Sequence, residues 1–107
     1  MKLTDKKCVP CEGGVPSFDK KKIALYVKQL PKGWEVIDGK VLRKEFKFKN
    51  FPATIAFVNK VALIAQAEGH HPDMVVHYSR AIMDFSTHAI GGLSENDFIM
   101  AAKIEQN

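Results

Sequence analysis

The sequence predicts an α+β fold in which a four-stranded antiparallel sheet carries three helices packed on one face. The expected elements follow the order helix, two strands, helix, two strands, helix, and a chain of 107 residues has no room for repeated parallel crossovers. Hydrophobic residues make up 46% of the chain, which is enough to bury a core and excludes intrinsic disorder as the main state. We therefore expect a single domain over residues 1–107, with residues 1–16 as a Pro/Gly-rich arm ahead of the core.

The first helix and the first hairpin are indicated by local signals at their ends. Asp19 can cap a helix over residues 20–30, which ends before a proline and a glycine. Asp38-Gly39 separates β-favourable runs over residues 34–37 and 40–49, and this dipeptide supplies the positive φ angles of a type I′ turn. Two antiparallel strands are expected here.

The longest helix is expected from residue 51 to about Glu68, with Asn50 as its cap and Pro52 in its first turn. Its apolar residues form two stripes: Ile55, Val58, Ala62 and Ala65 on one, and Phe57, Val61 and Ile64 on the other. In so small a domain one sheet covers one stripe, so the other is expected to meet a second copy of the chain. The sequence thus predicts a homo-oligomer.

The C-terminal part of the chain predicts a second strand pair and a last helix. Residues 74–78 and 80–87 are β-favourable runs, and two glycines end the second run. Ser94 with Asp97 three residues later resembles a capping box, so the last helix is expected to begin there.

The formal net charge of +4 is unevenly distributed, because residues 1–49 hold 13 Lys and Arg against 6 Asp and Glu. A basic half of this kind could bind nucleic acid. Its lysines, however, alternate through residues 40–49 as on the exposed face of a strand, with Phe46 and Phe48 on the core-facing side. We therefore favour a solvated face and expect no nucleic-acid partner, with an RNA-binding module as the alternative.

A membrane location is not expected from this sequence. No stretch approaches the roughly 18 apolar residues of a membrane span, and the N-terminal segment lacks the apolar region of a secretory signal. We therefore expect a cytoplasmic protein with no membrane partner.

Cys8 and Cys11 form a single Cys-Val-Pro-Cys motif near the N-terminus. A structural zinc site usually needs four ligands, and a thioredoxin-like redox motif would lie between a strand and a helix. We interpret the pair as reduced thiols in an ordered arm, with metal binding or redox chemistry as the alternative.

All four histidines of the chain, His70, His71, His77 and His88, fall within nineteen residues. The first two follow the long helix at Gly69, and His88 ends a later strand, so the two groups can converge if the helix packs across the sheet. Local chemistry leaves three interpretations: loop or capping residues, a metal site, or acid–base catalysis by imidazoles that titrate near neutrality.

Several spaced motifs resemble the pterin-4a-carbinolamine dehydratases: Glu68-Gly-His-His-Pro-Asp73, then Tyr78, Ser86-Thr-His88 and Gly-Leu-Ser-Glu-Asn-Asp97. The resemblance runs from about Phe18 to the end of the chain. It implies a lyase that removes water from 4a-hydroxytetrahydropterin to give quinonoid dihydropterin, in the recycling of tetrahydrobiopterin after an aromatic amino acid hydroxylase. It also implies a dimer or tetramer and a reaction that needs no metal and no cofactor.

The resemblance also implies roles for individual residues. His70 and His88 would be the acid–base groups, and His71, the third catalytic residue, would orient the pterin. The substrate-contacting positions would be Gly69, His70, His71, Ser86, Thr87, His88 and Ala89. We interpret Asp97 as a capping residue and Tyr78 as a packing residue, and His77 matches no catalytic position.

One position departs from the family pattern. Members commonly carry an acidic residue four positions before the first histidine, where this chain has Gln66; Glu68 points elsewhere on a helix. Two alternative functions stay open: a pterin-binding regulatory protein or dimerisation partner, and a role in molybdopterin metabolism.

Overall fold

The computed structural model describes residues 2–10 and 16–106. Its strands are β1 (Glu35–Ile37), β2 (Val41–Lys47), β3 (Asp73–Val76) and β4 (Arg80–Phe85). Its α-helices are α1 (Lys20–Val27), α2 (Phe51–Glu68) and α3 (Glu95–Ile104), and two short 3₁₀ helices, η1 (Leu3–Asp5) and η2 (His88–Ile90), complete it. None of the helices described is both long and apolar enough to cross a membrane.

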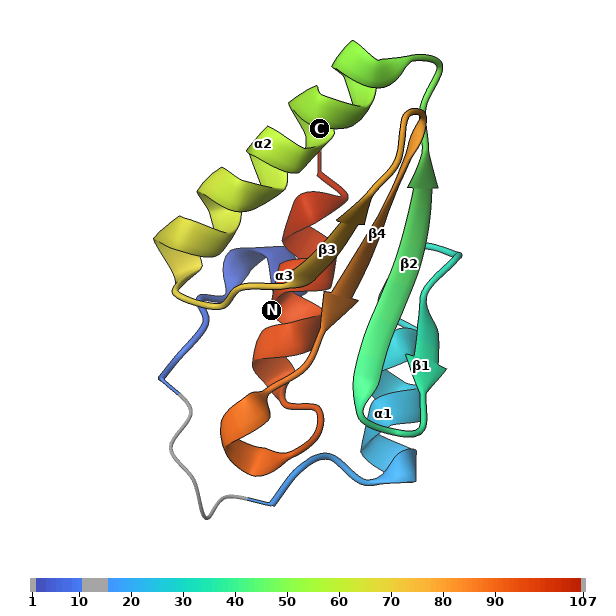
Figure 1. Ribbon diagram of the computed structural model, residues 1–107. Helices are drawn as coiled ribbons and strands as arrows, with labels where there is room; N and C mark the ends of the chain where they lie inside the picture. The colour runs from blue at the N-terminus through green and yellow to red at the C-terminus, as the bar shows by residue number, and fades with distance from the viewer. Residues whose placement is uncertain (1, 11–15, 107) are drawn as a thin grey trace.

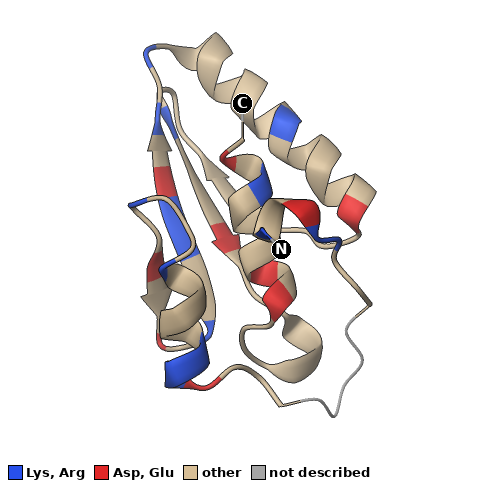
Figure 2. Ribbon diagram, turned by 180° about the vertical axis from the view of Figure 1, so that it is seen from behind, with Lys and Arg blue, Asp and Glu red and all other residues tan. Residues whose placement is uncertain are grey.

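The four strands form one antiparallel sheet in the order β1-β2-β4-β3. Helices α1 and α3 lie behind this sheet in Figure 1 and in front of it in Figure 2, so they cover the same face. Helix α2 packs against α3 and β4. The predicted fold class, an antiparallel sheet with three helices on one face, is confirmed.

Local capping and turn signals place most of the element ends. Asn50 accepts a hydrogen bond from the Ala53 backbone N–H and begins α2, as predicted. Asp38 and Gly39 both have positive φ angles, 54° and 69°, so the hairpin between β1 and β2 has its type I′ turn.

The first helix is shorter than predicted, because it ends at Val27 rather than at residue 30. The Gln29 and Leu30 backbone N–H groups bond three residues back, to Tyr26 and Val27. These tighter turns end the α-helix ahead of Pro31, which disfavours helical backbone at the residue before it.

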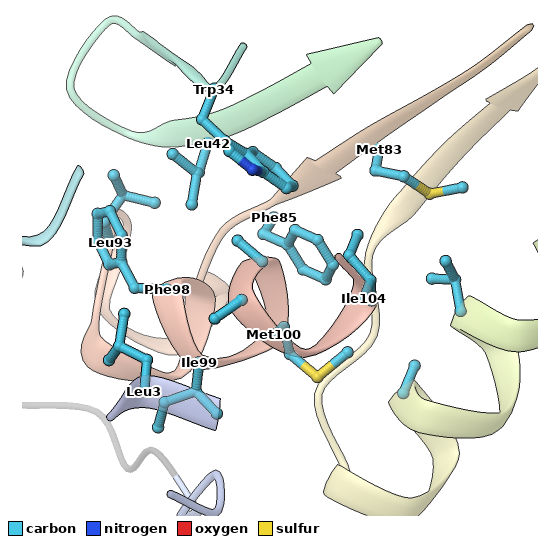
Figure 3. Close-up of a cluster of buried hydrophobic side chains, with 14 of the residues drawn as sticks. Leu3, Trp34, Leu42, Met83, Phe85, Leu93, Phe98, Ile99, Met100 and Ile104 are labelled. Carbon is cyan, nitrogen blue, oxygen red and sulfur yellow. The ribbon is translucent and has the colours of Figure 1, made fainter. Parts of the chain in front are cut away.

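Helix α3 is buried on both sides and forms the centre of the core. On one side it packs against sheet residues such as Phe85 and Leu42, and on the other against η1, where Leu3 lies beside Ile99 (Figure 3). Leu3 is 5% exposed, so the prediction that the core begins after the N-terminal arm is wrong. The apolar side chain of Leu3 fixes this part of the arm to the domain.

The hairpin turn supplies a stability prediction. A Cβ at Gly39 would meet no atom within 4 Å, so a substitution there acts through the backbone alone. We expect Gly39→Ala to lower the free energy of unfolding by about 1–2 kcal/mol, since an L-residue in the left-handed region costs that much. Gly39→Asn is the control, because asparagine tolerates this conformation. Urea titrations in which Ala and Asn variants both match wild type would contradict the turn assignment.

Candidate active site

The end of α2 and the segment after β4 meet at one cavity of about 300 Å³. Gly69 adopts a left-handed conformation, with φ of 69°, that ends α2 and turns the chain into His70. All seven substrate-contacting positions predicted from the sequence line this cavity, together with three further residues. The full lining is Val9, Pro10, Gly69, His70, His71, Ser86, Thr87, His88, Ala89 and Asn96.

His70 is held by a buried carboxylate. Its Nε2 lies 2.6 Å from Oδ1 of Asp97, whose side chain is fully buried, while the His70 side chain is 13% exposed. A carboxylate is an acceptor only, so His70 Nε2 carries the proton of this bond and Nδ1 is the nitrogen left for a ligand. The pairing fixes both the tautomer and the orientation of the ring.

Asp97 also performs the capping role that the sequence predicts. Its Oδ2 accepts hydrogen bonds from the Ser94 backbone N–H, at 3.0 Å, and from the Thr87 hydroxyl, at 2.8 Å. The capping box with Ser94 is confirmed. The contact with His70 was missed, because the spacing that identifies a cap says nothing about a side chain 27 residues earlier.

His71 and Gln66 lie side by side at the exposed rim. The His71 Nε2 and the Gln66 Oε1 are 3.2 Å apart, so the glutamine amide can accept a hydrogen bond from the imidazole. Glu68 points elsewhere, as expected: it accepts hydrogen bonds from the Lys103 ammonium and the Cys8 backbone N–H. These two bonds lower the pKa of Glu68 below its usual value.

His88 is exposed and stands at the start of η2, on a short loop anchored at both ends. Thr87 pairs with Gly92 across the base of this loop, and the Thr87 hydroxyl is bonded to Asp97. The loop therefore holds His88 at the cavity through its backbone, while His88 itself is exposed to solvent.

The remaining predicted residues lie away from the cavity. His77 follows β3, and its imidazole Nε2 is 3.4 Å from a guanidinium nitrogen of Arg80. Tyr78 is 69% exposed and stacks on Phe51, with 6.2 Å between ring centroids, so its packing is at the surface.

Cys8 is a half-buried thiol whose sulfur lies 3.7 Å from the Asn96 carbonyl oxygen. Burial and the neighbouring Glu68 carboxylate raise its pKa to about 12, so it is protonated at neutral pH. Cys11 lies outside the described residues. Within residues 2–10 and 16–106, no three His, Cys, Asp or Glu side chains are grouped as metal ligands would be.

The exposed face of the sheet carries charges of both signs. Figure 2 shows both basic and acidic residues along the strands, and Arg43 and Arg80 are paired with Asp84 and Glu45. Phe46 and Phe48 pack against the core, as predicted, so neither ring is available for base stacking. These pairs favour the solvated-face interpretation, but Lys44 departs from it: its ammonium pairs with Glu105 at 2.7 Å and its side chain is only 15% exposed.

Comparison with known proteins identifies the family. The family model described as "Pterin 4 alpha carbinolamine dehydratase" matches residues 16–107. The chain belongs to this family, and with it to the hydro-lyases. Relatives whose names assign them to the pterin-4-alpha-carbinolamine dehydratases include proteins of Nitrosomonas eutropha, 52% identical over 96% of this chain and 90% of the relative, and of Rickettsia bellii, 47% identical over 96% and 91%.

Solved structures agree with the dehydratase family assignment. A Brucella melitensis protein described as a transcriptional coactivator/pterin dehydratase superposes with a TM-score of 0.77 at 30% identity, over 82% of this chain and 94% of its own. A pterin dehydratase-like protein described as a RuBisCO assembly factor superposes with a TM-score of 0.58 at 20% identity, over 67% of this chain and 84% of its own, which shows a shared fold.

The Gln66 contact generates a test of the electrostatics of this dehydratase site. A carboxylate beside His71 stabilises the charged imidazolium, so Gln66→Glu should move the NMR titration midpoint of His71 and the pH profile of kcat/KM to higher pH. Ala67→Glu, which adds the same charge at the next residue, is the matched control. Superimposable curves for Gln66→Glu and wild type would mean that this position does not tune the site.

Proposed function

We propose that this chain dehydrates 4a-hydroxytetrahydropterin to quinonoid dihydropterin, with His70, His71 and His88 as the working side chains. The observation that carries the proposal is the convergence of these three imidazoles on one cavity, with His70 oriented by a buried carboxylate. Membership of the dehydratase family supports the same reaction.

The chemistry requires two proton transfers. The C4a–O bond breaks as the leaving oxygen receives a proton and departs as water, and the adjacent ring nitrogen loses its proton as the C=N double bond forms. Imidazoles suit both steps, because they exchange protons near neutral pH.

The environments of the two acid–base groups differ. The Asp97 carboxylate accepts the hydrogen bond of His70 Nε2–H, which leaves His70 Nδ1 as the atom that can accept a proton. His88 is exposed to the cavity mouth and would supply the proton to the leaving oxygen. His71 would hold the pterin together with the backbone of Gly69 and of Ser86–Ala89.

The cellular role is part of the proposal. We assign the reaction to tetrahydrobiopterin recycling beside an aromatic amino acid hydroxylase in the cytoplasm, as the family resemblance implies. The regulatory alternative is favoured by the description of the Brucella melitensis relative as a coactivator, and a chain that binds pterin without turnover would support it.

Histidine variants test the catalytic assignment. We expect His88→Ala and His70→Gln to lower kcat by about 10²- to 10⁴-fold, the usual contribution of a positioned proton-transfer group. His70→Gln keeps a donor for the buried Asp97 carboxylate, so folding is preserved. His71→Ala should act mainly on KM. His77→Ala is the control and should match wild type; full activity of His70→Gln would remove His70 from the mechanism.

We also propose that the chain assembles through α2 and the β3 edge. Of eight exposed large hydrophobic residues in the described chain, six lie on or beside these two elements: Phe51, Leu63, Met74, Val75, Val76 and Tyr78. β3 is an edge strand with all four of its residues exposed, and Leu63 is 74% exposed on α2. Apolar surface concentrated on a free edge is typical of a subunit interface.

Assembly can be measured by sedimentation. We expect a dimer or tetramer for wild type and dissociation for Leu63→Glu and Val75→Lys, since a charge placed in an apolar interface must be desolvated. Leu25→Glu is the matched control, because Leu25 is 62% exposed on α1, outside the proposed interface. A stable wild-type monomer of 12.0 kDa at micromolar concentration would contradict the proposal.

A further inference from the structure

We propose that the N-terminal arm forms one wall of the substrate cavity, and that Asn96 is the positioning residue that holds this wall in place. The inference rests on the proposed function, because it concerns how the same cavity binds its pterin. The wall consists of Val9 and Pro10, which line the cavity beside His70 and His71.

The arm is fixed to the end of α2 and to the start of α3. The Cys8 backbone N–H donates to Glu68 Oε1 at 2.8 Å, which ties the arm to the last turn of α2, directly before Gly69 and His70. Lys6 Nζ lies 2.7 Å from Glu95 Oε2, which ties it to the first turn of α3. In Figure 1 the arm accordingly runs past the end of α2 next to the α2–β3 connection.

Asn96 clamps the arm at the wall itself. Its Oδ1 accepts the Val9 backbone N–H at 3.0 Å, and its Nδ2 donates to the Val9 carbonyl oxygen at 2.7 Å. Only a carboxamide offers an acceptor and a donor in this arrangement. Asn96 is 5% exposed, so the clamp is sheltered from water and losing it would leave buried polar groups without partners.

The clamp determines what the wall presents to a ligand. Both backbone groups of Val9 are used by Asn96, and proline has no N–H, so the wall offers no backbone donor to a ligand and its side chains provide apolar contact. Val9 is 65% exposed beside the cavity. A flat, uncharged heterocycle such as a pterin would cover this apolar surface while its polar edges meet the imidazoles and backbone groups opposite.

The arm is an addition to the part of the chain that defines the family. The matched family model begins at residue 16, after the wall. The Nitrosomonas eutropha relative, however, is similar over 96% of this chain, which is too large a share to leave out residues 6–10. A wall contributed from outside the family domain is a means of adjusting substrate affinity without changing the proton-transfer groups.

Two variants of the full chain test the wall. Asn96→Asp keeps the acceptor for Val9 N–H and loses the donor, and Val9→Ala leaves the clamp intact and removes two methyl groups from the wall. We expect each to weaken binding of biopterin, a stable pterin, and to raise KM, by about 3- to 10-fold for Val9→Ala, with kcat within about twofold of wild type. Lys7→Ala, an exposed arm residue that does not line the cavity, is the control.

The outcomes separate this inference from the function it rests on. Unchanged Kd, KM and kcat in both variants would overturn the proposal that the arm is a wall of the cavity. A fall in kcat alone in Asn96→Asp would also overturn it, because Asn96 would then act on proton transfer through Asp97. Absence of turnover and of biopterin binding in wild type would instead overturn the proposed function. Amide hydrogen exchange at Val9 shows whether Asn96→Asp breaks the clamp, since exchange becomes faster when the clamp is lost. Unchanged Kd and KM in this variant count against the wall when exchange at Val9 is faster than in wild type.

Discussion

The buried carboxylate of Asp97 is the interaction on which the site and much of the fold depend. Three segments meet on its two oxygens: His70 after α2, Thr87 after β4, and the Ser94 backbone at the start of α3. A buried carboxylate without partners costs about 3–5 kcal/mol, so each segment is held where the others need it. The same carboxylate therefore caps α3 and orients the His70 imidazole.

The two residues before Asp97 extend this arrangement to the rest of the chain. Glu95 accepts hydrogen bonds from Lys6 and from the Tyr26 hydroxyl, which lower its pKa; burial and this bond raise the pKa of Tyr26 to about 12. Asn96 holds the arm at Val9. Three consecutive residues in the first turn of α3 thus contact α1, the arm and the cavity-lining His70.

The sequence was sufficient where the determining contacts are local. The caps at Asn50 and Ser94 and the turn at Asp38-Gly39 each involve residues within three positions of one another, and all were predicted. The arm was not, because its contacts with Asn96 join residues 87 positions apart and leave no periodic pattern. The cavity was predicted only in part for the same reason. The sequence motifs identified the histidines that line it, but not the contact of Asp97 with His70 or the wall formed by Val9 and Pro10.

The negative charge near the cavity depends on which face of α2 residues 66 and 68 occupy. Positions 66 and 68 lie two residues apart on a helix and point in nearly opposite directions, so Glu68 cannot replace the acidic residue that the family resemblance leads us to expect at position 66. Glu68 has its pKa lowered by Lys103 and the Cys8 N–H, so it stays ionised through the range where histidines titrate, with its charge offset by the ammonium. Its stabilising effect is present at neutral pH and is lost only as the pH falls through that lowered pKa. Asp97 is then the carboxylate that contacts His70, and Gln66 gives His71 a hydrogen-bond acceptor that carries no charge.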